Sequence, residues 1–317
     1  MKLEEFIEEW ENGADYVMGH TSGSTGAPKP IKLLKADMRA SARGTNSFFG
    51  IGKDSILALP LSLDYIAGKM MAVRAIEAGC RLMVIEPSNR FDWPERCDLL
   101  SIVPSQAPWL LEHPEGPRQI KNVIIGGGPL DETVRRRIVD AGYRAYCSYG
   151  MTETCSHVAL ARVAIQPLPY EAMPGISFGL DARGCLCIQT RNFSFELLVT
   201  NDMVELIDDR HFYWKGRIDN VINSGGLKIH PEILEKEISA IITEAFYIIG
   251  VPDERWGQAV GLVIEGTAQT AVEAYEKLRT ALDHRFLPKR VWAVEAIRRT
   301  MSAKLIREIP SKMPLSL

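Results

Sequence analysis

Residues 15–29 read DYVMGHTSGSTGAPK. The apolar run over 15–20 predicts a β-strand, and the two glycines that follow it predict a loop whose backbone can approach a phosphate closely. Backbone N–H groups, four hydroxyls and one mobile ammonium group then converge as donors for a polyanion. The predicted phosphate-binding residues are Thr21, Ser22, Gly23, Ser24, Thr25, Gly26 and Lys29.

The spacing of this loop, Gly-x-x-Gly-x-x-Lys, differs from the phosphate loop of the common NTPases, which has four residues between its glycines and then Gly-Lys-Ser/Thr. Pro28 also argues against a helix that begins there with Lys29 inside it. A flexible Ser/Gly/Thr hairpin loop without a ligand is the alternative that composition leaves open. The other motifs of the chain have to decide between the two interpretations.

The composition favours a globular protein with two domains. The chain has 317 residues, of which 46% are hydrophobic, so it is long for a single core. Its 37 basic and 40 acidic residues nearly balance, which argues against nucleic acid as the main partner. Three consecutive arginines, residues 135–137, are interpreted as the solvated face of a helix over 131–141.

The six cysteines include no Cys-x-x-Cys pair, so we expect reduced thiols with a structural role. The N-terminal residues are acidic and amphipathic and do not resemble a leader. No apolar run reaches the ~18 residues that a membrane span requires. The sequence therefore predicts a cytoplasmic protein without a membrane span.

The order of the predicted elements is that of an α/β fold, with a mostly parallel sheet in a large N-terminal domain. The predicted strands cover residues 31–34, 56–60, 81–85, 99–103, 122–125 and 143–148. The predicted helices of this part cover residues 3–10, 35–49, 65–78 and 131–141. Short strands with turns follow from about residue 176. A small α+β region begins near residue 217, with helices near 231–243 and 271–283.

Two segments follow strands of this predicted sheet, at the edge where ligands bind in such folds. They are the glycine loop 126–128 and the segment 148–153. In the second segment, Tyr149 can stack on a purine, Thr152 can bond a phosphate oxygen and Glu153 can hold Mg²⁺. Read alone, Thr152 with its acidic neighbour is equally typical of a helix N-cap.

Together these motifs resemble the adenylate-forming, AMP-binding superfamily of acyl-CoA synthetases, peptide-synthetase adenylation domains and luciferases. Residues 21–29 resemble its ATP-phosphate loop, and residues 149–153 resemble its Tyr-Gly-x-Thr-Glu motif. Asp202 stands where the family carries a Thr-Gly-Asp whose carboxylate takes the ribose hydroxyls, and Asn201 replaces that glycine. A turn aspartate is the alternative interpretation.

Three later stretches match the family in order. Residues 214–219 resemble the Gly-Arg-x-Asp that ends the large domain, with Arg217 near the nucleotide and Asp219 as the pivot. Residues 223–232 resemble the glycine-rich turn after the pivot, and residues 301–305 resemble the C-terminal Ser/Asn-Gly-Lys, with alanine in place of glycine. Beyond the phosphate loop, the nucleotide- and cofactor-binding candidates are Gly127, Gly128, Tyr149, Gly150, Asp202, Arg217, Gly225 and Gly226.

The resemblance implies a reaction in two steps. A carboxylate attacks the α-phosphate of ATP to give an acyl-adenylate and pyrophosphate, and the thiol of coenzyme A then displaces AMP. It also implies a large domain over 1–216 and a small domain over 217–317, which rotates about a hinge near Asp219 between the steps. The implied catalytic residues are Lys29, Thr152, Lys304 and Glu153, with Glu153 as the ligand of Mg²⁺.

Only twenty residues precede the phosphate loop, whereas family members carry many more, so we expect most of an N-terminal subdomain to be absent. Residues 148–157 and 220–232 most resemble the corresponding stretches of the o-succinylbenzoate–CoA ligases of bacterial menaquinone synthesis. A dicarboxylic acid needs a countercharge for the carboxylate that is not activated. The substrate-binding candidates are Lys69, Arg74, Ser148 and His157, for which exposed helix charges and a structural histidine are the alternatives.

Three other functions remain open from the sequence. The first is another acyl- or aryl-CoA ligase, acting on a benzoate-like or short-chain acid. The second is a degenerate nucleotide-binding protein that has lost catalysis. The third is an amino-acid-activating domain, which predicts a neighbouring carrier protein. In the preferred interpretation the partners are a small carboxylic acid, ATP and coenzyme A, and apolar surface left by the absent subdomain would serve a homo-oligomer.

Overall fold

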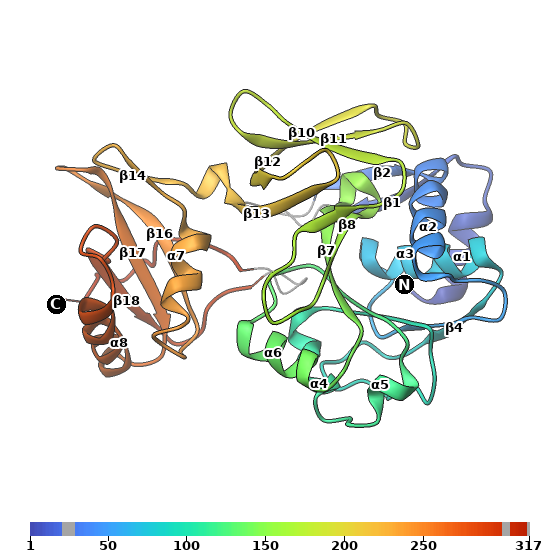
Figure 1. The fold of residues 1–317 in the computed structure, drawn as a ribbon, viewed down its shortest axis with the longest axis horizontal. Coiled ribbons are helices and arrows are strands. Elements are labelled where there is room, and N and C mark those ends of the chain that lie inside the picture. Colours follow the sequence, from blue (N-terminus) through green and yellow to red (C-terminus); the bar gives the residue numbers. More distant parts are fainter. Residues whose placement is uncertain (21–28, 300–304, 316–317) are drawn as a thin grey trace.

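The computed structural model describes residues 1–20, 29–299 and 305–315. Two sheets organise them, and Figure 1 shows these sheets side by side, joined by the chain between β13 and β14. The strands of the large sheet are β3 (Ile56–Leu59), β4 (Arg81–Val84), β5 (Leu99–Ile102), β6 (Val123–Ile125), β7 (Ala145–Met151), β8 (Ser156–Arg162), β9 (Tyr170–Ala172), β10 (Ile176–Leu180), β11 (Cys185–Thr190), β12 (Leu197–Leu206) and β13 (His211–Arg217).

The large sheet has 11 strands in the order β10-β11-β12-β13-β9-β8-β7-β6-β5-β3-β4. The strands from β4 to β7 pair in parallel, as the sequence predicts. From β7 to β10 every pairing is antiparallel. The short β-rich region is therefore not a separate layer, because it continues the parallel sheet.

Helices cover both faces of the parallel half. They are α2 (Lys35–Phe49), α3 (Ile66–Ala78), α4 (Ala107–Leu110), α5 (Gly116–Gln119) and α6 (Glu132–Asp140). In β3, Leu57 and Leu59 join the core under α2 and α3, whereas Ala58 joins the core under α4 and α6. This alternation is that of a strand buried on both faces, which parallel sheets require. Three short 3-10 helices complete this part: η1 (Pro104–Gln106), η2 (Thr152–Thr154) and η3 (Ile218–Asn220).

The N-terminal segment forms helix α1 (Leu3–Glu11) and a hairpin of β1 (Tyr16–His20) and β2 (Pro30–Leu34). Helix α1 buries Phe6 and Trp10 against the core under α2 and α3. The strand predicted over 15–20 is confirmed. The loop candidates from Thr21 to Gly26 lie outside the described residues, and Lys29 is an exposed residue directly before β2.

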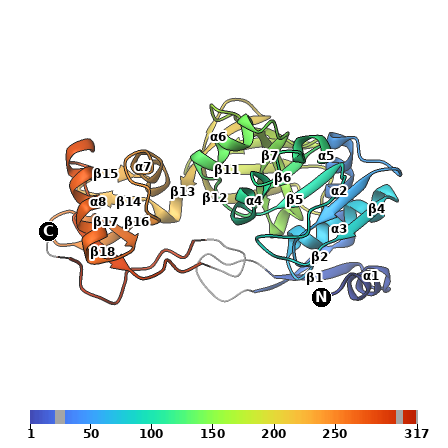
Figure 2. The same cartoon turned by 90° about the horizontal axis from the view of Figure 1, so that it is seen from below.

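The small sheet consists of β14 (Ile222–Ser224), β15 (Leu227–Ile229), β16 (Phe246–Asp253), β17 (Gly257–Glu265) and β18 (Arg290–Val294). Helices α7 (Pro231–Ile238) and α8 (Ala268–Ala281) pack on it around a core that includes Leu234, Leu262 and Leu278. After residue 304 the chain returns along this sheet, because the Leu315 N–H donates to the carbonyl oxygen of Val291 at 2.8 Å. Figure 2 shows this return beneath β16 and β18.

Several element boundaries differ from the sequence prediction. Strand β7 continues to Met151 because β8 pairs with it as a hairpin. Strand β12 runs through Asp202, which pairs with Arg217 of β13, so the alternative of a turn aspartate is wrong. Helix α7 ends at Ile238 rather than near residue 243. The domain boundary at 216 and 217 stays a prediction.

One compositional expectation is confirmed and another is modified. All six cysteines are free thiols. No helix within the described ranges combines the length and the apolar character that crossing a bilayer requires. On α6, Arg136 and Arg137 are exposed, but the Arg135 side chain is only 12% exposed and forms an ion pair with Glu132 at 3.4 Å.

Candidate active site

Asp202 is the centre of a buried polar cluster on the large sheet. Its carboxylate accepts hydrogen bonds from Tyr149 Oη at 2.8 Å, on Oδ2, and from Trp214 Nε1 at 3.1 Å, on Oδ1. The residue is only 7% exposed, and its backbone N–H donates to Thr200 Oγ1 at 3.0 Å. Each carboxylate oxygen has a second acceptor site, so the group remains able to accept the two hydroxyls of a vicinal diol.

Tyr149 connects the two halves of the large sheet. It belongs to β7, the last parallel strand, and its hydroxyl reaches Asp202 in β12. Burial and the negative charge of Asp202 raise the pKa of Tyr149 above its ordinary value, so the phenol stays protonated and donates. Its ring packs edge-on against Phe212, with the centroids 5.1 Å apart. The proposed stacking of Tyr149 on a purine stays a prediction.

Gly150 is required by packing between β7 and β8. A Cβ atom at this position would lie 2.1 Å from the carbonyl oxygen of Ser156 and 2.6 Å from the Cα of His157. No side chain fits at these distances. The structure thus gives this candidate a role in bringing β8 against the Tyr-Gly-x-Thr-Glu motif.

The glycine loop after β6 lies beside Ser148. A Cβ atom on Gly126 would be 2.5 Å from Ser148 Oγ, so the two segments that sequence places at one edge of the sheet are brought together. Gly127 and Gly128 continue this loop, next to Val103 and Pro104 at the end of β5. The loop, Ser148 and Tyr149 therefore line one edge of the sheet.

Thr152 and Glu153 follow directly in the 3-10 helix η2. Thr152 is buried and Glu153 is exposed. Met151, not Thr152, occupies the N-cap position of η2, so the alternative of a Thr152 N-cap is wrong. Among the residues that the structure describes, no three His, Cys, Asp or Glu side chains gather to hold a metal. A single carboxylate suits Mg²⁺, which commonly uses one or two carboxylates together with water and substrate phosphates.

Arg217 and Asp219 form an ion pair where the chain leaves the large sheet. Arg217 Nη2 lies 2.7 Å from Asp219 Oδ2, and Asn201 Nδ2 donates to both Asp219 oxygens at 3.2 Å. Burial lowers the pKa of Arg217, but the hydrogen bond to Asp219 and the charges of Asp202 and Asp219 outweigh it, so that the net change is upward. Arg217 is thus a fixed cation beside Asp202.

Lys69 and Arg74 are not exposed helix charges, which was the alternative interpretation, because they are 2% and 1% exposed. Lys69 Nζ lies 3.3 Å from Glu9 Oε2 of α1 and 5.0 Å from the centre of the Phe6 ring. The charge of Lys69 is therefore offset by a carboxylate of α1. This makes Lys69 the poorer candidate for a substrate countercharge.

Arg74 instead contacts neutral acceptors of β8. Its Nη2 donates to Ser156 Oγ at 3.1 Å and lies 3.5 Å from His157 Nδ1. Thr45 Oγ1 donates to the carbonyl oxygen of Ser41, so it accepts from His157 Nε2 at 3.0 Å. We therefore assign the proton of His157 to Nε2, which leaves Nδ1 to accept from Arg74.

Burial disfavours the charged forms of both His157 and Arg74. Burial, and secondly the charge of Arg74, hold the pKa of His157 well below its ordinary value, so His157 is neutral at pH 7. Burial lowers the pKa of Arg74 to about 9, which still leaves it charged. No ion pair is found for Arg74 within residues 1–20, 29–299 and 305–315, and its Nε is buried without a hydrogen-bond partner there. Such a cation is suited to an anion supplied by a ligand.

The backbone next to Arg74 is strained. Cys155 and Ser156 have positive φ values of 51° and 98°, and they are the only non-glycine residues of the described part that do. Such conformations cost on the order of 1–3 kcal/mol each and cluster at ligand sites. This strained turn directly follows η2, which contains Thr152 and Glu153, and presents the hydroxyl of Ser156 to Arg74.

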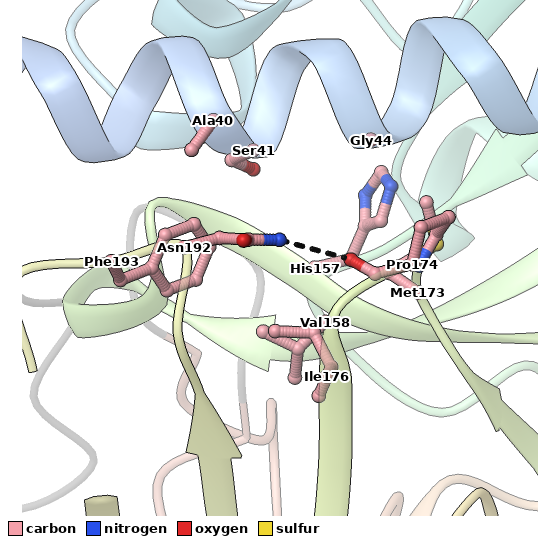
Figure 3. A pocket seen from close by; sticks show the side chains of 10 residues that line it. All are labelled: Ala40, Ser41, Gly44, His157, Val158, Met173, Pro174, Ile176, Asn192 and Phe193. Carbon is pink, nitrogen blue, oxygen red and sulfur yellow. Dashed lines mark hydrogen bonds between the residues drawn. The ribbon is translucent and has the colours of Figure 1, made fainter. Parts of the chain in front are cut away.

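A small cavity lies on the α2 side of this cluster (Figure 3). Its volume is about 20 Å³, enough for one water molecule but too small for an aromatic acid. His157 points into it from β8, opposite Ser41 and Gly44 of α2. The cavity thus adds a polar, water-sized space next to the Arg74 network.

The remaining candidates lie elsewhere. Gly225 and Gly226 form the turn between β14 and β15 in the small sheet, with positive φ values of 59° and 87°, which two-residue hairpins need. Lys304, like residues 21–26, lies outside the described residues. The structure thus places Ser148 beside the glycine loop, and Tyr149 and Arg217 beside Asp202. A further cluster consists of Arg74, Ser156 and His157.

Sequence reasoning gave no role to Trp214 or Thr45, which complete these two clusters. Trp214 has a sequence signal, because it lies three residues before Arg217, in the stretch 214–219 that resembles the family. Thr45 has none, since a threonine inside a helix ordinarily reads as a surface residue.

The comparisons with known proteins show the family of this chain. The family model described as "AMP-binding enzyme" matches residues 5–180. A solved acyl-CoA synthetase (AMP-forming)/AMP-acid ligase II-like protein from Dyadobacter fermentans is 35% identical, and the match covers 95% of this chain and 90% of that one with a TM-score of 0.62.

Two further relatives carry a more specific name. The 2-succinylbenzoate–CoA ligase of Enterococcus faecalis is 26% identical over 329 residues, which are 91% of this chain and 67% of the relative. The solved o-succinylbenzoate coenzyme A synthetase of Bacillus subtilis, in complex with ATP and magnesium ion, is 20% identical, and the match covers 92% of this chain and 68% of that one with a TM-score of 0.78. The last of these likenesses shows the fold, and the family match shows the membership: this chain belongs to the AMP-binding enzymes.

Proposed function

We propose that the chain is an ATP-dependent, AMP-forming carboxylate–coenzyme A ligase, and that its acid is o-succinylbenzoate. The observation that carries the nucleotide chemistry is the buried Asp202 carboxylate, held by Tyr149 and Trp214 in the large sheet of an AMP-binding fold. The name shared by the relatives in Enterococcus faecalis and Bacillus subtilis supports the acid. The neighbour solved with ATP and magnesium ion supports ATP as a reactant and Mg²⁺ as a cofactor here.

The geometry suggests how the first step proceeds. Asp202 accepts the ribose hydroxyls, which orients the nucleotide along the edge of the sheet. Arg217, fixed by Asp219, places positive charge near that nucleotide. In this proposal the phosphate loop and Lys29 hold the phosphates, and Lys304 stabilises the charge that builds up at the α-phosphate. Mg²⁺, held by Glu153, would offset phosphate charge.

In the second step the thiol of coenzyme A attacks the carbonyl carbon of the acyl-adenylate and AMP leaves. We propose that the small domain turns about the hinge near Asp219 between the steps, which removes Lys304 and presents the Gly225–Gly226 turn. Support comes from the arrangement of the chain, because η3 is the only segment between the last strand of the large sheet and the first strand of the small one. The orientation of the small sheet relative to the large one therefore depends on this short connection.

We further propose that Arg74 recognises the second carboxylate of the acid, with Ser156 beside it. The charge of Arg74 meets only neutral groups in the described part of the chain, and the strained turn at 155 and 156 holds Ser156 against it. Because the cluster is closed, the side chains around Arg74 have to move to admit the acid. His157 then acts by orienting Arg74 rather than as a charged group.

ATP–pyrophosphate exchange tests this function. We expect exchange that depends on an added acid and is fastest with o-succinylbenzoate, because only a dicarboxylate occupies both the reacting site and Arg74. Fastest exchange with benzoate or a short fatty acid would retain the ligase and reject the acid. Exchange with no acid in the panel would favour a nucleotide-binding protein without catalysis.

The role of Glu153 is tested by Glu153→Gln. The amide keeps the shape of the side chain but loses its charge, so we expect the Mg²⁺ concentration for half-maximal adenylate formation to rise by roughly 10-fold. The exposed Glu171→Gln variant on β9 is the matched control, for which the Mg²⁺ dependence should not change. An unchanged Mg²⁺ dependence in Glu153→Gln would contradict its assignment as the metal ligand.

The role of Arg74 is tested by Arg74→Met, which keeps much of the volume and removes the charge. We expect kcat/KM for o-succinylbenzoate to fall by about 10- to 100-fold, the value of one or two charged hydrogen bonds, whereas kcat/KM for benzoate changes little. Lys69→Met is the comparison, because the Lys69 charge is already offset by Glu9, and its effects on the two acids should run in parallel. Parallel losses in Arg74→Met would remove the countercharge role.

A further inference from the structure

Arg307 is a nearly enclosed cation three residues after Lys304. Its guanidinium donates from Nη2 to Glu235 Oε2 at 2.8 Å, from Nη1 to Glu235 Oε1, and from Nη1 to the carbonyl oxygen of Ile248 at 2.7 Å. The two side chains are 17% and 19% exposed. This is the bidentate arrangement in which an arginine fixes direction as well as position.

The pair closes an open edge of the small sheet. Ile248 belongs to β16, the edge strand at one end of this sheet. Glu235 Oε1 accepts the Ile248 N–H at 2.6 Å, while Arg307 takes the Ile248 carbonyl oxygen. The two side chains thus satisfy the backbone groups that a further strand would otherwise satisfy. Arg307 holds the returning chain at this one residue of β16.

The chain on both sides of residues 300–304 is tied together at the same place. Arg299 and Leu305 form an antiparallel bridge, and the Ile306 N–H donates to the carbonyl oxygen of Arg298 at 3.0 Å. Tyr247 Oη, again from β16, donates to the carbonyl oxygen of Glu308 at 2.7 Å. The residues that flank 300–304, namely 298–299 and 305–308, are called the stem below, and these contacts tie them to each other and to β16.

Helix α7 extends this anchorage to the connection between the two sheets. Glu232, one turn before Glu235, has its Oε1 3.9 Å from Arg307 Nη2 and accepts a hydrogen bond from Asn220 Nδ2 at 2.6 Å. A Cβ atom on Gly216 of β13 would lie 2.5 Å from Glu232 Oε2. Helix α7, which binds Arg307 through Glu235, thus also contacts Gly216 and Asn220, at the connection between the two sheets.

We propose that Arg307 is a positioning residue for the step in which Lys304 acts: through Glu235 and Ile248 it fixes the stem on β16, and through α7 it connects the stem to the hinge. The proposal rests on the proposed function, in which Lys304 acts in adenylate formation alone. Loss of the anchor therefore slows the first step and spares the second.

Three variants test this role: Arg307→Met, Arg307→Lys and Glu235→Gln. Single-turnover release of pyrophosphate measures the first step, and release of AMP from a supplied acyl-adenylate and coenzyme A measures the second. We expect Arg307→Met and Glu235→Gln to slow the first step on the order of 10- to 100-fold, because a displacement of about 1 Å has this effect. The second step should keep its wild-type rate. Arg307→Lys should recover part of the lost first-step rate, because lysine keeps the positive charge but cannot form the bidentate hydrogen bonds of the guanidinium group.

Arg285→Met is the control. Arg285 forms an exposed bidentate pair with Asp283 and, in the described part of the chain, does not contact the stem. Both steps should therefore keep their wild-type rates in this variant. Equal slowing of both steps in Arg307→Lys would show a merely structural role and overturn the proposal, as would an unchanged first step in Arg307→Met. A wild-type protein that forms no adenylate with any acid would instead overturn the proposed function itself.

Discussion

Lys304→Ala is expected to slow acyl-adenylate formation on the order of 100- to 1000-fold, the usual loss when one preorganised donor to a developing negative charge is removed. Attack on the α-phosphate concentrates charge on the phosphoryl oxygens, and the ammonium group is proposed to offset it. In the proposed mechanism the second step does not use this group. Thioester formation from a supplied acyl-adenylate should therefore keep its wild-type rate.

Lys289→Ala provides the control for this prediction. Lys289 is an exposed lysine of the same part of the chain, directly before β18, and its removal should leave both steps unchanged. The two steps are measured separately by pyrophosphate release and by AMP release. Equal loss of both rates in Lys304→Ala would contradict a role confined to adenylate formation.

Asp202→Ala is expected to raise KM for ATP by about 10- to 100-fold, because the ribose loses one or two hydrogen bonds to a charged acceptor. The substitution also leaves Tyr149 Oη and Trp214 Nε1 without their shared acceptor, so the thermal midpoint should fall. KM for the acid should change little, since the predicted acid-binding residues lie around Arg74.

The exposed Asp208→Ala variant separates these effects from general damage to the antiparallel half of the sheet. Asp208 lies in the turn between β12 and β13, where it accepts from the backbone N–H of Arg210 at 2.7 Å. Its loss should lower stability slightly and leave KM for ATP unchanged. A normal KM for ATP in Asp202→Ala would exclude Asp202 as the ribose acceptor.

The order of elements and the nucleotide edge of the sheet were predictable from sequence. Both depend on local patterns: apolar strands, the glycine loop 126–128 and the short motif 149–153 are each readable within a few residues. The continuous sheet was not, because the pairing of β13 with β9 joins residues far apart in sequence. Asp202 was for the same reason open to interpretation as a turn residue, since its strand is defined by its partner β13.

The burial of Lys69 and Arg74 illustrates a signal that the sequence did contain. From Gly68 to Ala75 the only charged residues are Lys69 and Arg74, so the sequence has no continuous polar face there, and the structure buries every residue of this stretch. A helix that is apolar all round lies inside a protein, and its two charges then need partners. What sequence could not supply is the identity of those partners, Glu9 in one case and Ser156 with His157 in the other.

The most direct test of the account is coenzyme A thioester formation, followed by coupled pyrophosphate release, with o-succinylbenzoate beside a panel of benzoates and short fatty acids. We expect turnover that requires ATP, Mg²⁺ and coenzyme A and is fastest with o-succinylbenzoate, and we expect Arg74→Met to lose this preference. Equal or faster turnover with a monocarboxylic acid by the wild-type protein would contradict it.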